Sequence, residues 1–193
     1  ANGGRLPWIS GGTIIKAVED AAYGLQVGAV SPSPIYSRFG YFIVKVFRSA
    51  GRESVKFRHI LLQPKDGRDS VATMALADSL VSILNMKPAQ QNAALSARGL
   101  QPTGDVFFDL AKAYSDDKTS AAKGGYLGAP YTRSGGMENN NQRLVPAFER
   151  AIFDLKDGQI SNKVQTMFGW HIIIRDSTKR PDAIVERDAA KRS

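Results

Sequence analysis

The sequence predicts an α+β fold built around a small sheet. Short runs in which apolar and polar residues alternate indicate strands, and segments with one apolar face at helical spacing indicate helices. Their order along the chain is strand, helices, short strand, helix and hairpin, which is typical of an α+β domain. The 193 residues, 42% of them hydrophobic, suffice for one large domain or two small ones with a buried core.

The first half of this predicted domain contains one strand and two helices. Residues 55–62 alternate and then run apolar, as a half-buried strand does. Residues 69–85 and 105–114 are predicted to form helices, because their large apolar side chains recur at helical spacing. Between these helices, residues 86–104 form either a loop or a short extra helix over residues 89–98.

The second half contains a short strand, a helix and a hairpin. Residues 123–128 predict a turn into a strand, and residues 134–142 predict a loop insertion. Residues 148–155 form a short helix that Gly158 terminates. The hairpin has predicted strands at residues 159–164 and 170–175 and a turn at residues 167–169.

An internal repeat relates the two ends of the chain. Residues 18–31 resemble residues 148–161, and residues 39–44 match residues 168–173 after one extra residue in the first copy. The first copy lacks a counterpart of the strand and helices that precede the second. We predict three parts: a partial, degenerate unit at residues 1–50, a complete unit at residues 54–177 and a basic tail at residues 178–193.

Charge and composition exclude several kinds of site. The net charge is +8, but the basic residues are scattered, and acidic residues interrupt the densest basic stretch, residues 179–192. A nucleic-acid binder is therefore the weakest of the functional classes, since no basic motif carries aromatic residues. The chain has no cysteine, which excludes disulfides, thiolate catalysis and cysteine zinc sites. No run approaches the ~20 apolar residues of a membrane-spanning helix.

The two histidines, His59 and His171, are the first candidates for chemistry, and each stands in a predicted strand. If these strands are neighbours, the imidazoles can face each other and share a hydrogen bond. One interpretation is a metal site completed by Asp117, although local spacing supplies no ligand set. A second is a serine hydrolase, which lacks its usual Gly-x-Ser-x-Gly motif here. A third is a buried histidine pair that lines an apolar binding or isomerase pocket.

Five blocks of sequence, in order, resemble parvulin-type peptidyl-prolyl cis-trans isomerases. They are residues 57–62, 108–117, 124–128, 145–149 and 168–173. The resemblance covers residues 55–176 and implies a small antiparallel four-stranded sheet with flanking helices. The first repeat is similar to the C-terminal half of a second such domain. This tandem arrangement resembles the periplasmic chaperone-isomerases of the SurA kind.

The resemblance implies a catalytic group of four residues. His59 and His171 match the paired histidines at the floor of the family's site. Thr166 matches the threonine that hydrogen-bonds within that pair. Asp117 falls where the family carries Cys or Asp beside the prolyl amide.

The resemblance also implies an apolar pocket for the proline ring. Leu127, Leu144 and Phe148 match this pocket, and Phe168 lies at its rim. In the first repeat, Phe42 replaces the second histidine and Val18 replaces the pocket phenylalanine. We therefore expect the first copy to be catalytically inactive and to serve in peptide binding or packing.

The expected function is rotation of X–Pro bonds in unfolded or extended polypeptides, without cofactor or covalent step. The clients are proteins rather than nucleic acid, and the expected location is the periplasm, with no signal peptide at Ala1. The alternative is a non-catalytic chaperone that binds peptides in the same groove.

Overall fold

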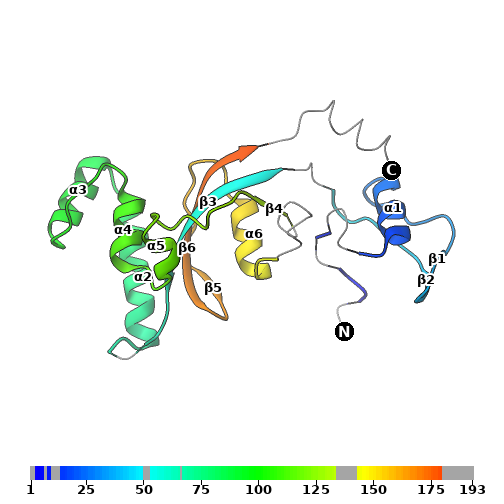
Figure 1. Cartoon of the computed structure of the whole chain (residues 1–193), viewed down its shortest axis with the longest axis horizontal. Coiled ribbons are helices and arrows are strands. Elements are labelled where there is room, and N and C mark those ends of the chain that lie inside the picture. The colour runs from blue at the N-terminus through cyan, green and yellow to red at the C-terminus, as the bar shows by residue number, and fades with distance from the viewer. Residues whose placement is uncertain are drawn as a thin grey trace. The chain divides into compact units, whose positions relative to one another are not determined.

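The structure is a computed structural model that describes residues 3–6, 8–9, 14–49, 53–65, 67–133 and 143–179. The chain forms two compact units (Figure 1). Unit 1 consists of Ala1–Ser54, Tyr131–Leu144 and Lys179–Ser193, and unit 2 consists of Val55–Pro130 and Val145–Thr178. The predicted loop insertion at residues 134–142 and the tail from residue 180 onward lie outside the described residues.

Unit 1 contains a helix and a hairpin. Helix α1 (Lys16–Gly24) buries Val18, and strands β1 (Ile35–Ser37) and β2 (Gly40–Phe42) pair antiparallel. Gly40 has a φ of +117°, which favours glycine at the point where the chain leaves the tight turn. The helix and the hairpin occur where the first repeat predicts them.

Unit 2 contains most of a sheet with the strand order β4-β3-β6-β5, of which the two-residue strand β4 is counted with unit 1. The strands are β3 (Ser54–Leu62), β4 (Tyr131–Thr132), β5 (Val164–Thr166) and β6 (Gly169–Lys179). β5 and β6 pair antiparallel through a turn at Met167 and Phe168. The predicted α+β fold around a small sheet is confirmed.

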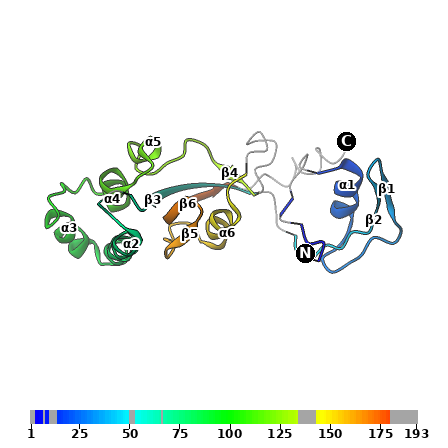
Figure 2. The same cartoon turned by 90° about the horizontal axis from the view of Figure 1, so that it is seen from below.

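Helices cover both faces of this sheet. On one face lie α2 (Ser70–Leu84) and α4 (Val106–Tyr114), and on the other lies α6 (Pro146–Asp154), as Figure 2 shows. Helix α3 (Pro88–Ser96) packs on α2 and α4, farther from the sheet. The core on the α2 side joins apolar side chains of β3 and β6 to those of α2, α3 and α4. Among its fully buried members are Ile60, Leu62, Leu80, Leu110 and Ile172.

Capping explains why two of these helices begin where they do. The Asp69 carboxylate accepts a hydrogen bond from the Ala72 amide at 2.8 Å, and Asp105 accepts one from Phe108 at 3.0 Å. Each satisfies an amide that the first turn of a helix leaves unpaired. Both helices match their predicted ranges to within a residue at each end.

Two local predictions differ from the structure. The predicted strand at residues 159–164 is wrong: only Val164–Thr166 forms a strand, and Ile160 makes a single bridge to Ile174. The reason is that the Ser161 hydroxyl accepts the Ile173 amide, at 2.9 Å, in place of a continuous ladder. Residues 123–128 give one bridge, between Tyr126 and Arg58, and no strand.

Two further outcomes concern helices. Of the two alternatives for residues 86–104, the helix is right, since α3 occupies Pro88–Ser96. A short helix that the sequence did not predict, α5 (Lys118–Ala121), follows α4. No helix in the described part of the chain has the length and apolar character needed to cross a membrane.

Candidate active site

The two histidines face each other across neighbouring strands of the unit 2 sheet. His59 on β3 and His171 on β6 approach to 3.3 Å between their Nδ1 atoms. Their rings are nearly parallel, at an interplanar angle of 16° with centroids 5.5 Å apart. Both side chains are buried on the face that α6 covers, where Phe148 contacts them. The structure thus brings together the pair that the strand positions suggested.

A carboxylate closes one end of this pair. His59 Nε2 lies 3.0 Å from Asp117 Oδ2 and 3.1 Å from Ser120 Oγ, and the Ser120 hydroxyl donates to Asp117 Oδ2 at 2.5 Å. Asp117 is held in place because it caps α5 by accepting from the Thr119 and Ser120 amides. The short helix therefore fixes the carboxylate against His59.

A hydroxyl closes the other end. Thr166 Oγ1 lies 2.8 Å from His171 Nε2 and also accepts the Phe168 amide at 3.1 Å. We call the set Thr166, His171, His59 and Asp117 the histidine row. Residues from β3, β5, β6 and the start of α5 form it.

The charge of Asp117 fixes the direction of the hydrogen bonds in the row. Burial pushes the pKa of Asp117 upward, but hydrogen bonds from Ser120 and His59 outweigh burial and lower the pKa. An ionised carboxylate only accepts hydrogen bonds, so His59 donates from Nε2 and accepts at Nδ1. His171 then donates from Nδ1 and accepts at Nε2 from the Thr166 hydroxyl. Every polar atom of the row is satisfied by this assignment, which follows from the network.

Both imidazoles are neutral in this arrangement. Burial lowers the pKa of His59, and the nearby Asp117 offsets only part of that effect. Burial and the neighbouring His59 lower the pKa of His171 to about 4. A proton added to either ring would create a buried charge. It would also place two donors opposite each other where the row now has one donor and one acceptor at each hydrogen bond.

Phe148 on α6 covers the row. Its ring stands edge-on to His171, with centroids 4.8 Å apart, and edge-on to His59, at 5.5 Å. The side chain is 3% exposed and also contacts Phe57. The buried ring is therefore a packing partner of both imidazoles.

The other predicted pocket residues have different surroundings. Leu127 and Phe168 are 44% and 51% exposed, so solvent reaches both. Leu144 belongs to unit 1, where its amide donates to the Tyr131 hydroxyl at 3.1 Å. Its place in a proline pocket stays a prediction.

Two features of the site were missed by sequence reasoning. Ser120, which bonds both Asp117 and His59, lies in the short helix that was not predicted. Gly125 has a φ of +90°, and a Cβ there would lie 2.2 Å from the His59 carbonyl oxygen. The Gly125 carbonyl accepts the His59 amide at 2.9 Å. The Gly-Gly pair at residues 124–125 was the available signal of this close approach.

The geometry argues against the two other interpretations of the histidines. Among the described residues, no group of three His, Asp or Glu side chains converges as a metal site would require. In a serine hydrolase the acid and the serine contact opposite nitrogens of the histidine, but Asp117 and Ser120 share Nε2 of His59. Ser120 is also 1% exposed, so a substrate cannot reach its hydroxyl.

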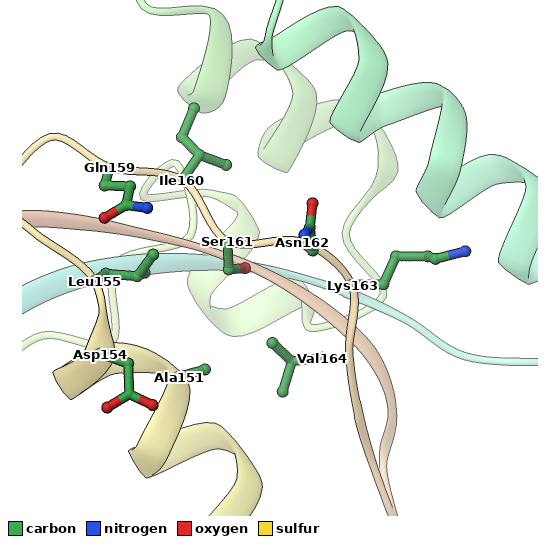
Figure 3. A pocket seen from close by; sticks show the side chains of 9 residues that line it. All are labelled: Ala151, Asp154, Leu155, Gln159, Ile160, Ser161, Asn162, Lys163 and Val164. Atoms are coloured by element: carbon green, nitrogen blue, oxygen red, sulfur yellow. The ribbon is translucent and has the colours of Figure 1, made fainter.

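Two hollows of unit 2 lie near this region. One, of about 560 Å³, is lined in part by Thr166 and Phe168. The other, of about 460 Å³, lies between α6 and residues 159–164 (Figure 3). In this second hollow Lys163 extends toward α2, where it pairs with Asp78 at 2.5 Å. None of the histidine-row residues lines it, whereas the first hollow shares Thr166 with the row.

Comparison with known proteins identifies the family. The PPIC-type PPIASE domain matches residues 47–178, and a second match to a PPIC-type PPIASE domain covers residues 1–48. The chaperone SurA of Methylococcus capsulatus is 35% identical over 176 residues, which are 89% of this chain and 33% of that protein. The SurA of Nitrosococcus oceani is also 35% identical, over 89% of this chain and 35% of that protein.

The chain thus spans about a third of the length of these relatives. A solved structure, the peptidylprolyl isomerase PrsA of Bacillus anthracis, is 28% identical and has a TM-score of 0.47, covering 73% of this chain and 49% of PrsA. The family match over residues 47–178 is more than half of the 193 residues. The protein belongs to the PPIC-type peptidyl-prolyl isomerase, or parvulin, family.

Proposed function

We propose that unit 2 catalyses the non-covalent rotation of X–Pro bonds in unfolded or extended polypeptides, and so assists protein folding. The observation that carries this proposal is the histidine row, a fully satisfied and oriented set of polar groups beside apolar side chains. The chain's membership of the parvulin family supports it.

The chemistry requires no cofactor and no nucleophile. Resonance in the X–Pro amide sets a rotation barrier of about 18–20 kcal/mol. A catalyst lowers this barrier by binding the twisted amide better than either planar form. An apolar pocket made by Leu127, Phe148 and the rim residue Phe168 would hold the proline ring and exclude water from the amide. Loss of water weakens the dipolar resonance form.

Asp117 is the residue that acts on the amide in this proposal. Its side chain is 23% exposed, whereas that of His59 is 7% exposed, so a client can approach the carboxylate. The planar amide carries partial negative charge on its carbonyl oxygen, and rotation reduces that charge. An ionised Asp117 beside the carbonyl therefore disfavours the planar form more than the twisted form.

His59, His171 and Thr166 are positioning residues in this scheme. The imidazoles hold Asp117 in one orientation through the His59 bond, and Thr166 fixes the tautomer of His171. Phe148 packs on both rings and holds them in the buried position.

We propose unfolded or extended polypeptides with X–Pro bonds as partners and the periplasm as location. The curated relatives described above are both named chaperone SurA, which supports protein clients for this chain. The tandem arrangement of related units supports the same assignment.

The direct test is exchange NMR on short X–Pro peptides with the whole chain. We expect Phe148→Ala to reduce the rate enhancement more than His59→Ala or His171→Ala, because it removes pocket and packing together. Phe148→Leu, which keeps most of the buried volume, serves as a folded control and should retain more activity than Phe148→Ala. No rate enhancement by the folded wild-type chain would overturn the proposal.

A second candidate is a non-catalytic chaperone that uses the same groove. The near-complete burial of Phe148 favours it, since a ring that packs on the histidines has less surface for a proline. Suppression of aggregation by the wild-type chain, without acceleration of any X–Pro peptide, would establish this alternative.

A further inference from the structure

Asp116 is the buried neighbour of Asp117, and the scheme above gives it no role. Its side chain is 7% exposed, whereas that of Asp117 is 23% exposed. Two consecutive carboxylates therefore have different surroundings, one open to a client and one enclosed by the protein. A buried charge is costly unless hydrogen-bond partners satisfy it. The partners of Asp116 accordingly show which parts of the fold this carboxylate holds together.

Three donors surround the Asp116 carboxylate. Lys65 Nζ lies 2.6 Å from Oδ1, the Gln63 amide donates to Oδ2 at 2.9 Å, and the Arg68 guanidinium also donates to Oδ2. Burial pushes the pKa of Asp116 upward, but these hydrogen bonds outweigh burial and lower the pKa. The Asp116 amide in turn donates to the Leu61 carbonyl at 2.7 Å. Asp116 thus fastens the end of β3 and the β3–α2 connection to the segment that leads into α5.

Gln63 extends this connection to the β5–β6 hairpin. Its side-chain amide donates to the Phe168 carbonyl oxygen at 2.9 Å, and the Phe168 amide donates to Thr166 Oγ1 at 3.1 Å. We call Asp116 and Gln63 the outer link. It joins the segment before α5 to the turn of the hairpin through the first residue after β3.

Two routes therefore connect Asp117 to Phe168. One is the histidine row, which reaches the Phe168 amide through Thr166. The other is the outer link, since Asp116 directly precedes Asp117 in the chain and Gln63 bonds the Phe168 carbonyl. Together the two routes close a ring of covalent and hydrogen bonds, which fixes Asp117 and Phe168 relative to each other.

The separation of these two residues matters for the proposed isomerisation. In that scheme Asp117 acts on the carbonyl of the X–Pro bond, and Phe168 lies at the rim of the pocket for the proline ring. A displacement of about 1 Å between groups that must act together can cost about a hundredfold in rate. Building on the proposed function, we propose that Asp116 and Gln63 are positioning residues that set the separation of Asp117 and Phe168. They act through these two residues rather than on the client itself.

The first test removes the side-chain donor of the outer link. Gln63→Met keeps the length of the side chain and should lower kcat, measured by exchange NMR on an Ala–Pro peptide, about five- to tenfold. KM should change less than kcat, because the groups that contact the peptide are all kept. Gln63→Lys retains a donor and should restore most of the loss. Gln91→Met is the matched control, because the Gln91 side chain also donates to a backbone carbonyl, that of Leu84, at 3.0 Å.

The second test breaks the same link at its other end. Asp116→Asn keeps the shape of the side chain and removes the charge that holds Lys65 and Arg68. Because both variants break one link, the double variant should lose no more kcat than the more impaired single variant. Amide hydrogen exchange at Phe168 should become faster in Gln63→Met and stay unchanged in Gln91→Met. If Asp116→Asn does not fold, Gln63→Met decides the inference by itself.

Wild-type kcat in Gln63→Met would overturn the inference. So would equal losses in Gln63→Met and Gln91→Met, or losses that multiply in the double variant. Failure of the proposed function has a different mark, since the wild-type chain would then accelerate no peptide. In that case hydrogen exchange at Phe168 decides whether the outer link positions the pocket rim, and unchanged exchange in Gln63→Met overturns the inference as well.

Discussion

The two copies of the repeat have equivalent backbone hydrogen bonds but differ in how far their side chains are buried. The Gly28 amide bonds the Val46 carbonyl in the first copy as the Gly158 amide bonds that of Arg175 in the second, at 2.7 and 2.6 Å. The hairpins have the same register, with Ser37 opposite Gly40 and Thr166 opposite Gly169.

Serine hydroxyls also make equivalent hydrogen bonds in the two copies. Ser31 Oγ accepts the Val44 amide at 3.1 Å, and Ser161 Oγ accepts that of Ile173 at 2.9 Å. The short-range sequence therefore suffices to set the local backbone of both copies. Burial is different, because Ile43 is 73% exposed while its counterpart Ile172 is completely buried against β3 and the helices.

The largest expected effect tests this difference in burial. Ile172→Ala should lower the free energy of unfolding by about 2–5 kcal/mol, because it leaves a cavity in the unit 2 core. Ile43→Ala, at the matching position, should change it by less than about 0.5 kcal/mol. Chemical unfolding of the whole chain measures both. Equal losses would mean that the Ile43 face is covered in solution.

The histidine pair adds a pH-dependent contribution to the stability of unit 2, and unit 1 has no such pair, since Phe42 stands at the place of the second histidine. The folded pKa of His171 is lowered from 6.5 to about 4. The unfolded chain therefore takes up the proton first, and stability present above pH 6.5 is lost as the pH falls toward 4. We expect a loss of about 3 kcal/mol over this window.

His171→Phe, which copies the first repeat, isolates this effect. The substitution should make unfolding by denaturant less dependent on pH between 6.5 and 4. Asp117 titrates below this window, because its pKa is lowered from 3.8. An unchanged pH dependence in the variant would show that the stability loss arises elsewhere in the chain.

The smallest expected effect concerns the hydroxyl at the hairpin. Ser37 and Thr166 both accept an amide two residues later, at 3.1 Å, but only Thr166 also bonds a histidine. Thr166→Val should cost about 1–2 kcal/mol, since His171 Nε2 loses its partner. Thr166→Ser keeps the hydroxyl and should cost much less. Thermal unfolding distinguishes the two, and equal costs would argue against the Thr166–His171 bond.

Sequence reasoning succeeded where short-range signals decide the structure. The ranges of α2 and α4 follow from apolar spacing and from the capping residues Asp69 and Asp105. The placement of His59 and His171 on strands also followed from local alternation, whereas their pairing came from the family resemblance. These features need no knowledge of distant contacts.

Sequence reasoning failed where contacts between residues far apart in the sequence decide the structure. The predicted strand at residues 159–164 is shortened because the Ser161 hydroxyl replaces a ladder bond, which apolar alternation does not report. Ser120 joins the site only because α5 turns back onto β3, and nothing in its neighbourhood marks it. Asp117 was identified by family resemblance, since no spacing links it to His59, 58 residues away.

His59 holds the α5 segment at two points. Its side chain bonds Asp117, and its backbone amide bonds the Gly125 carbonyl, so the chain from one to the other forms a loop closed on a single residue. One residue more or fewer in that loop would draw the carboxylate away from the imidazole or push a side chain into the His59 backbone. Homologous chains that keep the aspartate should therefore keep the length of this loop, even where its sequence drifts.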